Sequence, residues 1–116
     1  MTRRNILIVE DDIFIAADIE AVVLATLDAE TFVSRSVGRA RNLLDNSLDL
    51  ALLDVDVTNG KTFELALQLK RRCVPFIFIS GSRRDHIPDE LQDEPFIAKP
   101  CDERELVKAL LAMLPN

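Results

Sequence analysis

Residues that could bind a cation and a phosphoryl group occur at four places in the sequence, each directly after an apolar run. Three consecutive acids occupy positions 10–12, and single polar residues follow at Asp54, Ser80 and Lys99. Adjacent carboxylates repel one another, so three of them beside an apolar run indicate a positive partner, most simply a divalent cation. Carboxylate oxygens suit Mg²⁺, while a lysine and a hydroxyl suit the oxygens of a phosphoryl group.

The apolar runs alternate with helical patterns, which predicts an α/β fold. Short apolar segments predict strands at 5–9, 50–53, 76–79 and 96–98, and a weaker strand is predicted at 30–34. Apolar spacing predicts helices at 13–27, 37–46, 62–72 and 103–114. Asp12 suits the N-cap of the first helix, residues 58–60 form a loop, and Phe63, Ala66, Leu67 and Leu69 face the core. Five strands, each followed by a helix or a substitute for one, predict a parallel, doubly wound sheet with helices on both faces.

The chemically interesting residues all follow predicted strands. Ligands of such sheets bind beyond the carboxyl ends of the strands. Because the strands end before Glu10-Asp11, Asp54, Ser80 and Lys99, one crevice would receive all of these side chains. A lone aspartate after a strand is usually only a cap, and Lys99-Pro100 by itself is an ordinary turn. The set as a whole is much more specific than any of its members.

Together these residues resemble the receiver domain of bacterial two-component response regulators, the CheY-like family. Glu10-Asp11, Asp54, Ser80 and Lys99-Pro100 occur in the family's order, and the resemblance covers essentially all 116 residues. It implies a flavodoxin-like sheet with strand order 2-1-3-4-5 and a single receiver domain over 1–116, without an effector domain. It also implies a cytoplasmic signalling protein, which catalyses only its own aspartyl phosphorylation and dephosphorylation.

The resemblance assigns the acids to a phosphorylation site. Asp54 would be the phosphoacceptor, and its phosphoryl group would come from a sensor histidine kinase or a histidine phosphotransfer protein. Mg²⁺ would be the cofactor. It would be held directly by Asp11 and Asp54, mainly through water by Glu10, and by the backbone carbonyl of Asp56.

Three further residues take roles from the same resemblance. Ser80 would move toward the phosphoryl group, and Lys99 would pair with it. Phe96 occupies the aromatic position that changes rotamer on activation in the family. The output would be contact with a downstream protein, or a phosphoryl group passed on or lost as in a relay or sink.

The segment 80–95 departs from most receivers. It carries Gly81, Pro88 and Pro95, and too few residues remain for a stable helix. We therefore expect a degenerate fourth helix, irregular and more mobile than the flanking strands. The run FISGS at 78–82 resembles the Phe-Ala-Thr-Gly-Tyr motif of a stand-alone alphaproteobacterial subgroup with a shortened fourth helix.

Charge and composition narrow the possible functions. The net charge of −6 argues against binding to nucleic acid, which needs a basic surface. The sequence has no apolar run of membrane-spanning length and no secretory leader. Cys73 and Cys101 show neither metal-site nor disulfide spacing, which favours a reducing cytoplasm.

Three other functions are compatible with parts of the pattern. The chain could be a receiver-shaped interaction module that is never phosphorylated. The run DVDVT at 54–58 matches the nucleophile motif of haloacid-dehalogenase-type phosphatases, although that motif belongs on the first strand. A flavodoxin-like cofactor binder is disfavoured, because no phosphate-cradling loop follows the first strand and the chain has no Trp or Tyr.

Overall fold

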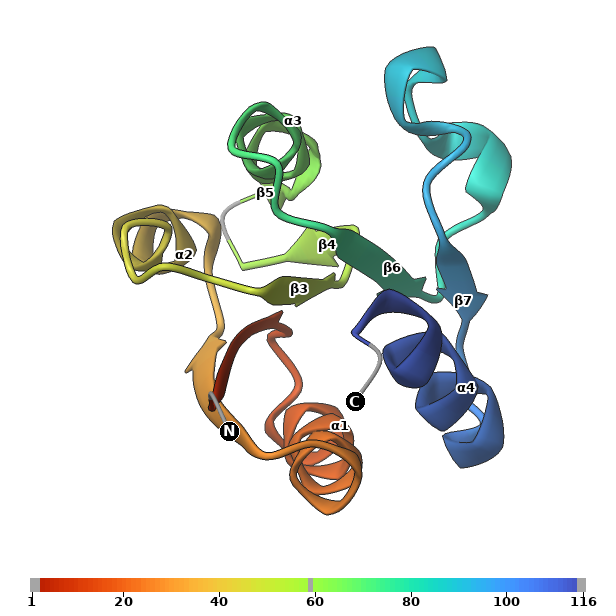
Figure 1. The fold of residues 1–116 in the computed structure, drawn as a ribbon. Helices are drawn as coiled ribbons and strands as arrows, with labels where there is room; N and C mark the ends of the chain where they lie inside the picture. The colour runs from red at the N-terminus through yellow and green to blue at the C-terminus, as the bar shows by residue number, and fades with distance from the viewer. Residues whose placement is uncertain (1–2, 59, 115–116) are drawn as a thin grey trace.

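The computed structural model describes residues 3–58 and 60–114, and its centre is one five-stranded parallel sheet (Figure 1). The strand order is β2-β1-β3-β6-β7, which is the predicted order 2-1-3-4-5 with two short strands inserted in the numbering. The strands are β1 (Arg4–Val9), β2 (Ala29–Ser34), β3 (Leu50–Leu53), β6 (Phe76–Ser80) and β7 (Phe96–Ala98). The predicted strands and the predicted fold class are confirmed.

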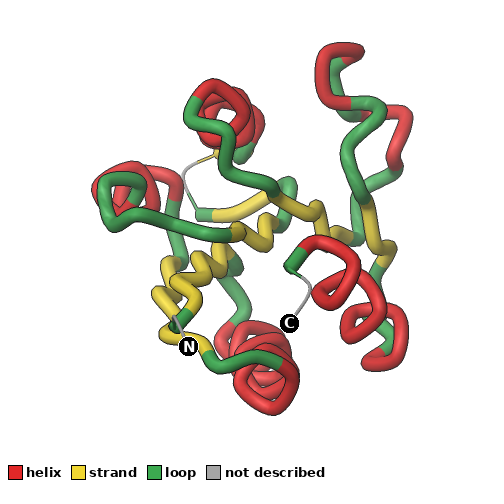
Figure 2. Tube along the Cα trace, viewed as in Figure 1, coloured by secondary structure: helices red, strands yellow, loops and turns green. Residues whose placement is uncertain are grey.

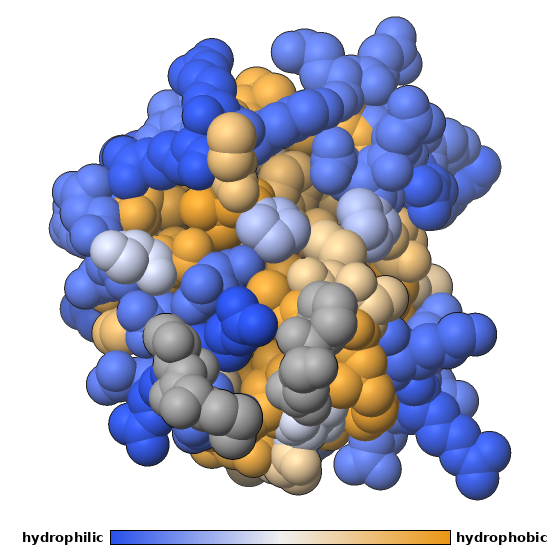
Figure 3. Space-filling view, viewed as in Figure 1, coloured by the Kyte–Doolittle hydropathy of each residue, from blue (hydrophilic) through white to orange (hydrophobic). Residues whose placement is uncertain are grey.

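Four helices cover the two faces of the sheet. They are α1 (Ile13–Thr26), α2 (Val37–Leu43), α3 (Phe63–Arg71) and α4 (Glu103–Met113). Figures 1 and 2 show α1 and α4 on one face and α2 and α3 on the other. Hydrophilic side chains gather along the outer helices (Figure 3).

The central strands β3 and β6 and residues 6–9 of β1 are almost entirely apolar because both of their faces are buried. Alternate residues of one strand enter opposite halves of the core: Leu7 and Val9 pack with α2 and α3, and Ile6 and Ile8 with α1 and α4. All four of these side chains are fully buried. The sheet is therefore a rigid platform, and the residues that follow its strands are held in fixed positions.

Side-chain N-caps define where three of the helices begin. The Asp12 carboxylate accepts hydrogen bonds from the backbone N–H groups of Phe14 and Ile15, which confirms the predicted N-cap. Ser36 and Asp102 cap α2 and α4 in the same way.

The segment between β6 and β7 contains no regular helix. It forms two short 3-10 turns, η1 (Arg84–His86) and η2 (Asp89–Leu91), separated by Pro88. This confirms the predicted degeneration of the fourth helix. Ile87 and Leu91 are buried and attach the segment to the core beside α3, whereas its mobility remains a prediction.

Three local predictions were wrong. The predicted 58–60 loop lies in a small hairpin, β4 (Asp56–Val57) and β5 (Gly60–Lys61), while Asn59 is outside the described residues. The helix α2 ends at Leu43 instead of residue 46. In α3, the predicted Ala66 and Leu69 are fully buried, but so is Leu65, which was not predicted, while the predicted Phe63 and Leu67 are only partly buried against the core. Every apolar residue of α3 is a core candidate, so spacing alone did not select the correct face.

The burial of Leu91 predicts that the segment without a regular helix contributes to stability. Leu91 is 1% exposed, whereas Leu24 on α1 is 50% exposed. Leu91→Ala is expected to lower the free energy of unfolding by about 2–5 kcal/mol, and Leu24→Ala by less than about 1 kcal/mol. Urea denaturation of the two variants makes the comparison. Equal effects would show that the segment is not packed on the core.

Candidate functional site

The pairing of the central strands brings the first acids to Asp54. Val9 and Leu53, the last residues of β1 and β3, are partners in register, so Glu10 and Asp54 follow side by side. The backbone N–H of Asp54 donates to the carbonyl of Val9 at 2.9 Å. The pairing of β1 with β3 thus fixes the backbone positions of Glu10 and Asp54 relative to each other.

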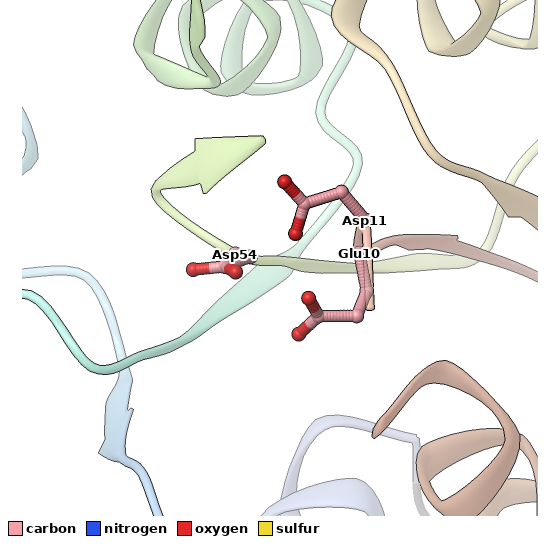
Figure 4. Close-up of side chains that lie close together, drawn as sticks. All are labelled: Glu10, Asp11 and Asp54. Atoms are coloured by element: carbon pink, nitrogen blue, oxygen red, sulfur yellow. The ribbon is translucent and has the colours of Figure 1, made fainter. Parts of the chain in front are cut away.

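The three carboxylates of Glu10, Asp11 and Asp54 converge on one space (Figure 4). One oxygen from each lies within 4.8 Å of the others. Glu10 and Asp54 are buried, and Asp11 is partly exposed. Among the described residues, Asp11 makes no hydrogen bond or ion pair, so its charge is the least compensated of the three.

Lys99 supplies the positive charge in this cluster. Its ammonium group lies 2.6 Å from Oε1 of Glu10 and 3.0 Å from Oδ2 of Asp54. The side chain is 18% exposed. The backbone N–H of Lys99 donates to the carbonyl of Ser80 at 3.0 Å, and the Lys99-Pro100 peptide is cis. Lys99 therefore lies beside the acids, as the sequence predicted, whereas its role toward a phosphoryl group remains a prediction.

Burial and hydrogen bonding shift the pKa values of Glu10 and Lys99 in opposite directions. Burial raises the pKa of Glu10, although the hydrogen bond from Lys99 opposes the shift. For Lys99, burial by itself lowers the pKa, but hydrogen bonds to Glu10 and Asp54 outweigh it, so the pKa is raised. Lys99 is therefore held as a cation at neutral pH.

Ser80 and Phe96 lie on neighbouring strands near the cluster but outside its ion pairs. Ser80 is buried at the end of β6, and its Oγ accepts a hydrogen bond from the N–H of Ser82 at 3.1 Å. In the described structure the Ser80 hydroxyl forms no hydrogen bond with Asp54 or Lys99. Phe96 is partly buried on β7. The roles predicted for both residues remain predictions.

The Asp56 side chain is not part of the carboxylate cluster. It pairs with Lys61 and accepts a hydrogen bond from the Ser82 hydroxyl at 2.6 Å. Both contacts lower the pKa of Asp56, and the hydrogen bond from Lys61 has a larger effect than that from Ser82. The side chain thus ties the hairpin after Asp54 to the loop after β6, whereas metal binding by the Asp56 carbonyl remains a prediction.

Sequence reasoning missed Thr62, which supports the backbone of Asp54. Thr62 is fully buried, and its hydroxyl donates to the Asp54 carbonyl at 2.6 Å. Its N–H donates to the carbonyl of Val55 at 3.0 Å. The sequence signal was only a threonine before a helix, a position where capping is the ordinary role, yet its hydroxyl makes no such cap.

The donor set fits Mg²⁺. It consists of carboxylate oxygens alone, close enough together to share one ion, and Mg²⁺ prefers one or two carboxylates together with water and phosphate oxygens. The described part of the chain offers no cysteine or histidine at this cluster, so a softer metal has no preferred ligand here.

Comparisons with known proteins give partial sequence matches. No family model matches the sequence. The transcriptional regulatory protein CpxR of Escherichia coli K12 is 33% identical over 118 aligned positions, and CpxR of Klebsiella pneumoniae is 32% identical. These alignments cover 96% of this chain but 49% of the CpxR sequences. The chain thus spans about half the length of these relatives.

Solved structures match over nearly the whole chain. A signal receiver domain of an HD domain-containing protein from Pseudomonas fluorescens has a TM-score of 0.86 at 20% identity, covering 98% of this chain and 88% of its own. The non-phosphorylated HemR receiver domain from Leptospira biflexa has a TM-score of 0.82 at 23% identity, covering 98% and 96%.

A third solved structure shows the same fold. A CheY-like receiver domain protein from Methanospirillum hungatei has a TM-score of 0.83 at 22% identity, covering 96% of this chain and 93% of its own. None of the helices in the described residues is both long and apolar enough to cross a membrane. This chain therefore has the flavodoxin-like fold of the CheY-like receiver domains, and its sequence is similar to about half of CpxR.

Proposed function

We propose that the chain accepts a phosphoryl group on Asp54 from a sensor histidine kinase or a histidine phosphotransfer protein. The observation that carries this proposal is the position of the Asp54 carboxylate. It lies 3.0 Å from the Lys99 ammonium group and within 4.8 Å of oxygens from Glu10 and Asp11. A buried aspartate is thereby surrounded by the charges that phosphoryl transfer requires.

The acids would hold the metal that this reaction uses. Asp11 and Asp54 would ligate Mg²⁺ directly, Glu10 would act mainly through water, and the carbonyl of Asp56 would complete the protein ligands. When bound, Mg²⁺ would offset the negative charge of the carboxylates and of the incoming phosphoryl oxygens. Asp11 is suited to direct contact because it is partly exposed and has no other partner in the described structure.

The reaction would convert a phosphohistidine into an acyl phosphate. An Asp54 carboxylate oxygen attacks phosphorus, the bond between phosphorus and the histidine nitrogen breaks, and the leaving imidazole takes up a proton. Lys99 then exchanges its contact with Asp54 for one with a phosphoryl oxygen. The Ser80 hydroxyl, at the end of the adjacent strand β6, would donate to another oxygen. Hydrolysis of the acyl phosphate restores Asp54.

The output would be protein contact or onward transfer of the phosphoryl group. We propose that residues 1–116 act as a single cytoplasmic receiver domain, with Phe96 as the side chain that changes rotamer. CpxR is named as a transcriptional regulator, but only half of it is matched, so that role is not carried over. The net charge of −6 supports protein partners rather than nucleic acid.

The proposed acceptor predicts that Asp54→Asn abolishes phosphorylation. The variant keeps the size of the side chain and removes the nucleophilic carboxylate, so labelling by acetyl phosphate with Mg²⁺ should fall to background. Asp18→Asn, an exposed position on α1, is the matched control and should label like the native chain. Incorporation is followed by intact-protein mass spectrometry and, for each candidate kinase, by transfer of radiolabelled phosphate.

Other outcomes separate the competing functions. Undiminished labelling of Asp54→Asn would contradict the assignment of the acceptor. A native chain that binds a partner but takes up no label from any donor would be an unphosphorylated interaction module. Turnover of a generic phosphomonoester would favour a phosphatase of the haloacid-dehalogenase type.

A separate prediction concerns the uncompensated charge of Asp11. Because this carboxylate repels Glu10 and Asp54 without a partner of its own, Asp11→Asn should leave metal-free stability unchanged or raise it by up to about 1 kcal/mol. The same change should remove the stabilisation by Mg²⁺, which grows with ligand concentration over Kd. Paired thermal melts with and without Mg²⁺ measure both effects.

Asp12→Asn is the matched control for this experiment. It removes the neighbouring charge but retains an amide that can cap α1, and Asp12 is not in the carboxylate cluster. This control should keep the response to Mg²⁺. A metal-free melting temperature that falls in Asp11→Asn would contradict the repulsion between these carboxylates.

A further inference from the structure

The segment 81–95, which replaces a fourth helix, is held together in part by the side chains of Arg84 and Gln92. Its guanidinium nitrogen Nη2 donates to the carbonyl of Gln92 at 2.8 Å and to that of Glu94 at 3.2 Å. In return, the Gln92 amide donates to the carbonyl of Arg84 at 3.0 Å and to that of Ile87. These contacts close the segment between η1 and the approach to β7.

The same guanidinium lies against Phe96. Its central carbon is 5.8 Å from the centre of the Phe96 ring, a position in which a cation is attracted to the aromatic face. Phe96 is the register partner of Phe78 on β6. The ring of Phe78 packs edge to face with that of Phe76 at 5.5 Å. Arg84 therefore joins the surface segment to an aromatic side chain beside the core.

The far side of the segment is fastened separately. Lys70 on α3 donates to the carbonyl of Glu90 at 3.2 Å and forms an ion pair with Glu94, also at 3.2 Å. Leu91 is buried beneath it. While that side is attached to α3, the Arg84 guanidinium contacts Phe96 on β7, the strand that ends one residue before Lys99.

We propose that Arg84 is a positioning residue that couples the conformation of segment 81–95 to the side chain of Phe96. Any movement of the Phe96 ring removes the surface on which the guanidinium lies and loosens the two carbonyl contacts that close the segment. Under the proposed function, on which this second part rests, phosphorylation of Asp54 reaches a protein partner through Arg84. The chemistry needs arginine, since a planar fork both stacks on a ring and donates twice.

The first test uses the unmodified protein. Hydrogen exchange of the Ile87, Gln92 and Glu94 amides, followed by NMR, should become about tenfold faster in Arg84→Ala, the factor that corresponds to about 1.4 kcal/mol. Arg83→Ala is the matched control, because within the described residues the Arg83 side chain pairs with Asp85 alone, and it should change these rates less than about twofold. Equal effects of the two variants, or amides unprotected in the native chain, would overturn the coupling.

A double-mutant cycle separates coupling from a merely structural role. Phe96→Leu removes the ring and retains an apolar side chain. If the two residues act together, the effects of Arg84→Ala and Phe96→Leu on exchange should not add, and Arg84→Lys should fail to restore native rates. Additive effects would show that Arg84 stabilises the segment independently of Phe96.

The signalling part is tested with Mg²⁺ and beryllofluoride, a mimic of the acyl phosphate. In the native chain, amide signals of Asp54 and Lys99 should shift together with those of Gln92 and Glu94. In Arg84→Ala the first pair should still shift and the second pair should not. Shifts of all four in the variant would overturn the role of Arg84, whereas no shift at Asp54 in the native chain would overturn the proposed function itself.

Discussion

The ammonium group of Lys99 lies between two buried carboxylates, those of Glu10 and Asp54. Charges taken out of water need a partner of opposite sign, and breaking such a buried group leaves an uncompensated charge. Here the three residues come from positions separated by up to 89 residues of sequence. Their juxtaposition therefore requires that β1, β3 and β7 end at the same edge, and the rest of the fold serves to keep those ends in place.

The sheet meets this requirement with backbone register and apolar burial. Strand residues alternate between two halves of the core, so a shift of one residue in register would turn buried side chains toward the wrong helices. Thr62 adds a local restraint by donating to the carbonyl of Asp54. Where the regular helix is missing, Arg84 and buried Leu91 provide the attachments that a helix would otherwise supply.

The sequence predicted most of the strands and the meeting of their polar ends because uniform apolar runs and chain order carry that information. It could not select the buried face of α3, where Leu65 and Leu67 are equally apolar. Nor could it reveal the hydrogen bond from Ser82 to Asp56, which joins loops 26 residues apart and depends on the packed fold. Nor did the sequence indicate the contacts of Arg84, since an arginine in a polar segment is ordinarily a solvated surface residue.

Chemical mapping of the acyl phosphate on the native chain tests the central claim most directly. After treatment with acetyl phosphate and Mg²⁺, borohydride reduction converts a phosphorylated aspartate to homoserine, which peptide mass spectrometry locates. Asp54 should be the only carboxylate converted, so the product should appear at position 54 and require Mg²⁺. Conversion at another carboxylate, or none at position 54 in a chain that has incorporated phosphate, would contradict the assignment of this cluster as a phosphorylation site.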